Sequence, residues 1–97
     1  MPMTRNDMVF DLMSNFQPWE FWKLQRAISE KFDKWYGEPS ISAAIRDLRK
    51  PDARERYNLP PTGEVVIKEK RPKGGGYQYR LAPSIIQYQR GKNDGRA

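Results

Sequence analysis

The stretch from residue 40 to residue 50 constrains this chain most, because its pattern fits a helix with two different sides. At about 100° per residue, the apolar side chains fall on one side: Ile41, Ala44, Ile45 and Leu48. Small and cationic side chains fall on the other: Ser42, Ala43, Arg46, Arg49 and Lys50. Ser40 is expected to cap this helix and Pro51 to stop it. Such a helix can bury its aliphatic side and present its basic side to a polyanion.

Two amphipathic segments precede this stretch and are predicted to be helices over 5–14 and 18–34. In the first, Thr4 and Asp7 have the spacing of a capping box. Apolar residues follow there at helical spacing: Val9, Leu12, Met13 and Phe16. In the second, Gly37 is expected to end the helix. Its core stripe is expected to consist of Phe21, Leu24, Ile28, Phe32 and Trp35.

Two tryptophans of the second predicted helix, Trp19 and Trp22, lie about 160° and 100° away from that core stripe. One interpretation is that they form a second apolar face, packed on the first helix or on the C-terminal segment. The other is that they form an exposed aromatic patch that binds a partner.

Residues 51–64 give the weakest signal, since their prolines favour an extended segment while residues 52–57 fit a single helical turn. Arg54 and Arg56 are open to two interpretations. Either they contact a phosphate backbone, or they pair with the acidic residues beside them, Asp52 and Glu55.

Two runs whose side chains alternate between two faces predict an antiparallel hairpin over 64–71 and 76–82, joined by a glycine-rich turn. Its core face is expected to carry Val65, Ile67, Tyr77, Tyr79 and Leu81. Its opposite face is expected to carry Lys68, Lys70 and Arg80. The three glycines do not form a phosphate loop, because a strand and not a helix follows them. A basic hairpin suits the backbone or minor groove of a nucleic acid.

Missing residue types exclude several kinds of chemistry. The chain has no cysteine and no histidine, and so it lacks disulfides, thiolate ligands and the commonest general base. We therefore expect no enzyme, no metal site, no cofactor and no small-molecule ligand. No apolar run approaches the roughly 20 residues that span a bilayer, and the first residues lack the pattern of a secretory signal. We expect a cytoplasmic protein with no membrane partner.

The charge is unevenly distributed along the chain. Residues 1–45 have a net charge of −1, whereas residues 46–97 have a net charge of +7. The positive potential therefore belongs to the second half and begins inside the helix predicted over 40–50. A one-sided basic field is typical of proteins that bind nucleic acids.

Residues 40–51 resemble the recognition helix of small winged helix-turn-helix proteins, which are common in bacteriophage and prophage genomes. The likeness extends back to residues 18–20 (Pro-Trp-Glu) and forward to residues 77–81 (Tyr-Gln-Tyr-Arg-Leu), so that it covers most of residues 17–82. It implies an α+β fold: a winged helix-turn-helix with a three-helix core and a C-terminal antiparallel β-hairpin as the wing.

We expect one domain over residues 1–89, with a short helix over 83–89, followed by a disordered basic tail over 90–97. The expected function is sequence-specific binding of double-stranded DNA by a phage-derived transcriptional regulator. Helix 40–50 would enter the major groove, and the wing, 68–80, would contact the backbone or minor groove. The expected DNA-binding residues are Ser40, Ser42, Ala43, Arg46, Arg49, Lys50, Lys68, Lys70, Arg71, Lys73 and Arg80.

The alternative function is a winged-helix module for protein–protein interaction, such as a phage inhibitor of a host factor, because this fold serves both uses. A homodimer is a further expectation. The apolar residues expected at such an interface are Trp19, Trp22, Ile85, Ile86 and Tyr88.

Overall fold

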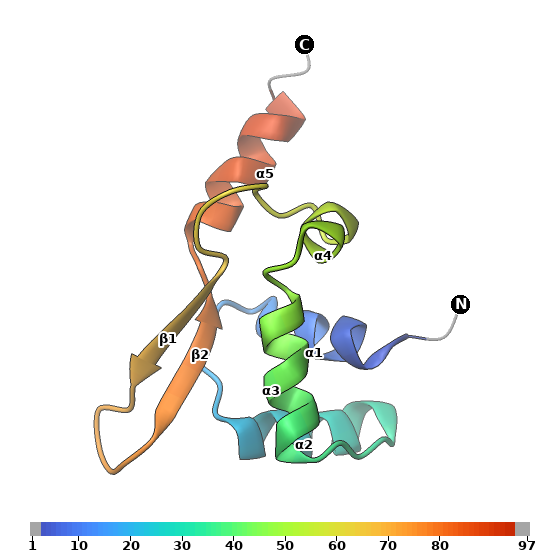
Figure 1. Ribbon diagram of the computed structural model, residues 1–97, viewed down its shortest axis with the longest axis vertical. Helices are drawn as coiled ribbons and strands as arrows, with labels where there is room; N and C mark the ends of the chain where they lie inside the picture. Colours follow the sequence, from blue (N-terminus) through green and yellow to red (C-terminus); the bar gives the residue numbers. More distant parts are fainter. Residues whose placement is uncertain (1–2, 95–97) are drawn as a thin grey trace.

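The first half of the chain forms three helices that pack against one another in pairs. They are α1 (Arg5–Met13), α2 (Phe21–Phe32) and α3 (Glu38–Asp47). The computed structural model describes residues 3–94, and Figure 1 shows its elements. After α3 come a short helix, a hairpin and a last helix: α4 (Pro51–Arg56), β1 (Val66–Lys70), β2 (Tyr77–Leu81) and α5 (Ser84–Asp94). The expected α+β class, with helices and a two-stranded antiparallel sheet, is confirmed.

The start of α1 is held by the predicted capping box. The Asp7 amide donates to the Thr4 hydroxyl over 3.1 Å, and the Thr4 amide donates to the Asp7 carboxylate over 2.9 Å. Two of the amide groups that a helix start leaves without partners are thereby satisfied.

The boundaries of α2 differ from the prediction at both ends. The helix begins at Phe21 and not at Pro18, because the backbone of Trp19 is engaged elsewhere. Trp19 exchanges two backbone hydrogen bonds with Tyr79, of 2.7 and 2.8 Å, and so forms an isolated antiparallel bridge beside β2. The helix ends at Phe32, where Asp33 takes the left-handed conformation with φ 56°. Trp35 therefore lies beyond the helix and is 66% exposed, so its predicted place in the core is wrong.

α3 begins two residues earlier than predicted and ends at Asp47, not at Lys50. Gly37 is its N-cap and not the end of α2, and Pro39 lies in its first turn, where a missing amide costs little. The predicted cap, Ser40, instead donates its amide to the Gly37 carbonyl over 3.0 Å. The predicted apolar side of α3 is confirmed, because Ile41, Ala44, Ile45 and Leu48 are all buried.

The hairpin forms where predicted, but the faces of β1 are reversed. Val66 pairs with Leu81, Lys68 with Tyr79 and Lys70 with Tyr77. Lys68 and Lys70 therefore lie on the same face as the tyrosines, whereas Ile67 and Arg80 lie on the opposite one. The prediction failed because Val65 and Val66 are both buried, and Val65 precedes the regular strand.

The last two helices differ from expectation in extent. The single turn predicted over 52–57 is confirmed as α4, which begins at Pro51. The helix predicted over 83–89 is confirmed as α5 but runs to Asp94, so the predicted start of the disordered tail at residue 90 falls inside a helix. Residues 95–97 of that tail lie outside the described residues. Figure 1 shows α5 and the hairpin tip at opposite ends of the long axis.

Within the described residues, no helix combines the length and the apolar character needed to cross a membrane. The core lies where α1, α2 and α3 meet, and it extends under the hairpin to α5. Its fully buried large side chains are Val9, Met13, Leu24, Ile28, Ile41, Ile45, Leu48, Val65, Val66, Leu81 and Ile85.

Candidate nucleic-acid interface

The outer side of α3 presents one long cation beside small side chains. Arg46 and Ser42 are exposed and Ala43 is half-buried, while Ile41 and Ile45 are buried on the opposite side. The guanidinium of Arg46 makes no hydrogen bond or ion pair with any residue whose side chain is described. Small neighbours let the helix backbone approach a ligand closely, and the unpaired guanidinium can reach past them.

The two cations that follow Arg46 are held by intramolecular contacts. Lys50 pairs with Asp47 over 3.1 Å, and Asp47 also accepts from Arg5 over 3.1 Å. These contacts, the one with Lys50 first, lower the pKa of Asp47. Arg49 donates to Glu64 over 3.1 Å and to the Val66 carbonyl over 3.2 Å. Arg49 therefore fastens the chain after α3 to the start of β1, which is a structural role.

The cations of the hairpin divide into two groups. Arg80 pairs with Glu69 over 3.0 Å, and Arg71 pairs with Glu20 over 3.2 Å. Lys70 and Lys73 are exposed and make no ion pair with a described side chain. Lys68 is also exposed, and its ammonium lies 4.3 Å from the centre of the Tyr77 ring. Of the predicted DNA-binding cations, Arg46, Lys68, Lys70 and Lys73 thus lack an acidic partner in the described part of the chain.

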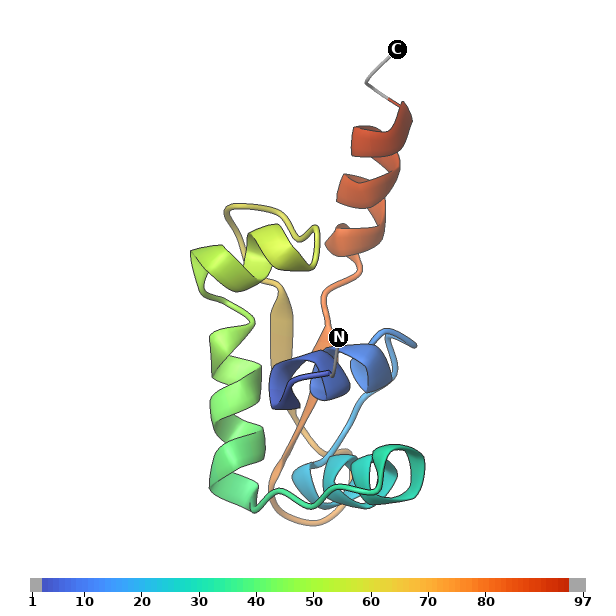
Figure 2. The ribbon, with the colours of Figure 1, turned by 90° about the vertical axis from the view of Figure 1, so that its right-hand side faces the viewer.

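Two of the unpaired lysines, Lys68 and Lys70, lie on one face of the hairpin. Lys68 and Lys70 share their face with Val66 and Leu81, which are buried. On the opposite face, Arg80 is neutralised by its ion pair with Glu69. The two views in Figures 1 and 2 show the hairpin extending alongside α3, with its tip towards the N-terminal end of that helix. The free cations of the hairpin and of α3 are therefore carried by neighbouring elements.

Neither open interpretation of Arg54 and Arg56 matches their contacts in full. Arg54 donates to the carbonyls of Arg49, Pro60 and Gly63 over 2.8 to 2.9 Å, and it thereby ties the loop after α4 to that helix. Arg56 pairs with an acidic residue, as one interpretation held, but that residue is Asp7 in α1 and not a neighbour. Sequence reasoning missed all of these contacts, because no partner lies at a helical or strand spacing from its arginine.

The predicted partner residues do not form one exposed surface. Trp22 is 52% exposed and Ile86 is 37% exposed, but Ile85 is buried in the core and cannot serve as a contact surface. Trp19 is half-buried, and its indole donates to Asn15 over 3.2 Å. Tyr88 is half-buried as well.

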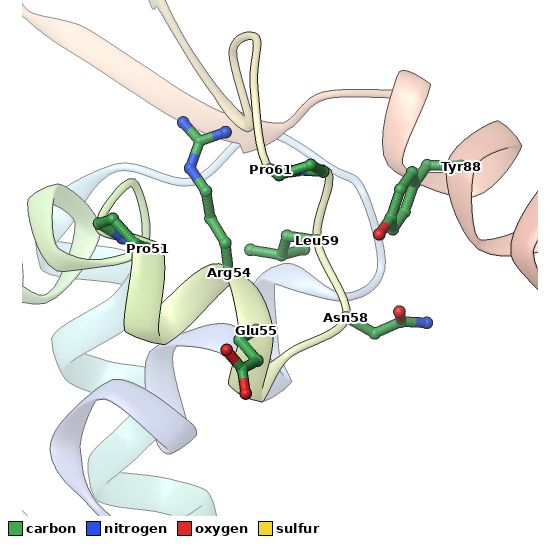
Figure 3. Close-up of a pocket in the computed structure, with 7 residues that line it drawn as sticks. All are labelled: Pro51, Arg54, Glu55, Asn58, Leu59, Pro61 and Tyr88. Atoms are coloured by element: carbon green, nitrogen blue, oxygen red, sulfur yellow. The ribbon is translucent and has the colours of Figure 1, made fainter.

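Tyr88 lines a pocket of about 340 Å³ between α4, the loop that follows it and α5 (Figure 3). Leu59 and Pro61 supply apolar walls, and Glu55 and Asn58 supply oxygen acceptors. The side-chain oxygen of Asn58 is buried and has no hydrogen-bond partner in the described part of the chain. Among the described residues, no group of three or more His, Cys, Asp or Glu side chains could hold a metal ion.

Comparison with known proteins found no matching family model, no matching curated protein and no matching solved structure.

Proposed function

We propose that this protein is a winged helix-turn-helix that binds double-stranded DNA in a sequence-specific way and acts as a transcriptional regulator. In this proposal α3 enters the major groove, and the hairpin is the wing that contacts the adjacent backbone or minor groove. The observation that carries it is the distribution of ion pairs: four cations on α3 and the hairpin have no acidic partner in the described part of the chain.

The four cations have different roles in this proposal. Arg46 lies in the last turn of α3, one turn after Ser42 and Ala43, and a guanidinium there can read a guanine edge with two hydrogen bonds. Lys68, Lys70 and Lys73 are point charges on the hairpin, and such groups contact phosphates without reading the sequence. The paired cations Arg49, Lys50, Arg71 and Arg80 maintain the structure, since a phosphate would have to displace a carboxylate from each.

The connectivity supports the same proposal. The Trp19 segment lies between α1 and α2 and pairs with β2, so that it links the three-helix core to the wing. This bridge fixes the hairpin relative to α2, against which α3 packs. A recognition helix and a wing need such a fixed relation if both are to contact one duplex.

Selection of bound duplexes from a random pool tests the proposal directly. The expected result is recovery of a common sequence, with affinity for it exceeding that for unrelated duplex by a large factor at the same salt concentration. Three phosphate-contacting lysines predict a slope of about −3 in a plot of log affinity against log salt concentration. Enrichment of no sequence, together with no salt-dependent duplex binding, would refute the proposal.

A protein-interaction module remains the second candidate function, and the exposed tryptophans favour it. Trp22 and Trp35 are 52% and 66% exposed, and tryptophan is enriched at the centres of protein interfaces. This alternative predicts little affinity for duplex DNA at physiological salt. The measurement of duplex affinity against salt concentration therefore distinguishes the two functions.

A further inference from the structure

A hollow of about 310 Å³ lies between the hairpin tip and the N-terminal ends of α2 and α3. Four aromatic rings line it: Phe21, Trp22, Tyr77 and Tyr79. Phe21 and Tyr79 stack with their centres 5.0 Å apart and their planes 9° from parallel, which fixes both rings. Trp22 and Tyr77 come from different elements and are 52% and 45% exposed. The hollow thus combines two anchored rings with two rings that are open to solvent.

Each of the exposed rings is accompanied by a lysine. The Lys23 ammonium lies 5.7 Å from the centre of the Trp22 ring, and that of Lys68 lies 4.3 Å from the centre of the Tyr77 ring. Lys70 is exposed on the same hairpin face as Lys68. Aromatic faces bordered by cations are what proteins use to bind single-stranded nucleic acids, because the rings stack on bases and the cations follow the backbone.

Two carboxylates, Glu20 and Glu38, line the hollow, and they differ in how far they would repel a phosphate backbone. Glu20 is buried, accepts from the Trp22 indole over 3.0 Å and pairs with Lys23 and Arg71. Its charge is therefore compensated within the protein. Glu38 is exposed at the rim and makes no ion pair with a described side chain. A glutamate in that position can accept a hydrogen bond from the N4 amino group of cytosine.

We propose that this hollow binds an unpaired base of a single-stranded nucleic acid, stacked on Trp22 and Tyr77, with Lys68 and Lys70 on the flanking phosphates. The inference rests on the proposed nucleic-acid-binding function and adds a site that is distinct from the outer side of α3. It assigns the aromatic residues of α2 and the hairpin to bases, and leaves Arg46 to the duplex groove.

Tryptophan fluorescence tests this site, with short oligo(dC) as the probe. Oligo(dC) is expected to quench the emission of the wild-type protein and of Trp35→Phe, and to leave that of Trp22→Phe unquenched. Tyr77→Ala is expected to weaken binding of labelled oligo(dC), measured by anisotropy, by at least about fivefold. The matched control, Trp35→Phe, changes a tryptophan that is also exposed, at 66%, but lies outside the hollow.

The outcomes separate this inference from the proposed function. Undiminished quenching in Trp22→Phe, or wild-type affinity in Tyr77→Ala, would overturn the site. Salt-dependent duplex binding without any oligo(dC) binding would overturn the site and leave the proposed function standing. If the wild-type protein binds neither duplex DNA nor oligo(dC), both the site and the proposed function are overturned. Because Trp22 and Tyr77 are exposed, neither substitution removes an apolar core contact; Trp22→Phe removes the indole hydrogen bond to Glu20. Circular dichroism of each variant verifies that it is folded.

Discussion

The carboxylate of Asp7 accepts two hydrogen bonds from the guanidinium of Arg56, of 2.8 and 2.9 Å, and so fastens the start of α1 to the end of α4. The neighbouring Tyr57 donates its hydroxyl to the same carboxylate and stacks on Phe10, with ring centres 4.4 Å apart. One acidic side chain thus caps a helix and holds two distant parts of the chain together.

This arrangement predicts acid sensitivity. The hydrogen bonds from Arg56, followed by those from Tyr57 and Thr4, hold the pKa of Asp7 well below its usual range despite its burial. The unfolded chain titrates Asp near pH 4. The contribution of Asp7 to stability is therefore fully present above about pH 4 and is lost as the pH falls towards its folded pKa.

Asp7→Asn is expected to lower the free energy of unfolding at neutral pH by about 2 kcal/mol and to flatten its dependence on pH below about 4. Urea unfolding at several pH values measures both effects. Asp33→Asn is the control, because Asp33 is exposed, forms no ion pair with a described side chain and has a backbone conformation that asparagine also tolerates. Equal pH profiles for wild type and Asp7→Asn would contradict the prediction.

Arg46→Ala is expected to weaken binding to the selected duplex by about 1–3 kcal/mol and to relax the sequence preference at one position. The reason is the loss of a base-edge contact, while the core side of α3 stays intact. Anisotropy titrations with the selected duplex and its single-base variants measure the change. Arg26→Ala, which removes an exposed helical arginine paired with Glu30, should bind as wild type does.

Lys70→Ala is expected to weaken binding to all duplexes alike and to make the salt slope shallower by about one, because it removes one phosphate contact. Arg80→Ala removes a hairpin cation that is already neutralised by Glu69, so it should leave the slope unchanged. Titrations over a range of salt concentrations distinguish the two variants, and equal slopes for both would rule out this division of the hairpin charges.

Arg54→Lys is expected to destabilise the fold by about 2 kcal/mol, since a lysine cannot reach three carbonyls with a planar set of donors. Thermal and urea unfolding measure the loss. Arg26→Lys, at an exposed position, is the matched control. A stability equal to that of the wild type would show that the loop after α4 does not depend on Arg54.

Ile86→Asp tests the expected homodimer. Ile86 is the exposed aliphatic residue of α5, whereas Ile85 is buried in the core. If the protein dimerises through this helix, sedimentation equilibrium will show a dimer for the wild type and a monomer for Ile86→Asp. A wild-type monomer, both alone and with duplex DNA, would refute dimerisation.

The helices were predictable where a single periodic pattern dominated the segment. Ile41, Ala44, Ile45 and Leu48 follow helical spacing and are buried, and the Thr4–Asp7 capping box depends only on residues three apart. The start of α2 was not predictable in the same way. It depends on Trp19 pairing with Tyr79, a contact between segments that are distant in sequence.

Charge pairing limited the prediction of the site. The sequence shows that the second half of the chain is basic, but it does not show that Glu64 engages Arg49 or that Glu20 engages Arg71. Those partners meet only when the loops and the hairpin are folded. The pair of Asp47 and Lys50 is an exception, since its three-residue spacing is visible in the sequence.

The Trp19 bridge covers one edge of the hairpin and leaves the other without a neighbouring strand among the described residues. An open strand edge can recruit a strand from another molecule and so begin aggregation. Lys68 and Lys70 lie on that edge strand, and a second copy pairing there would bring like charges together. The lysines proposed to contact phosphates therefore also keep the molecules apart, and a polyanion that neutralised them would remove that protection.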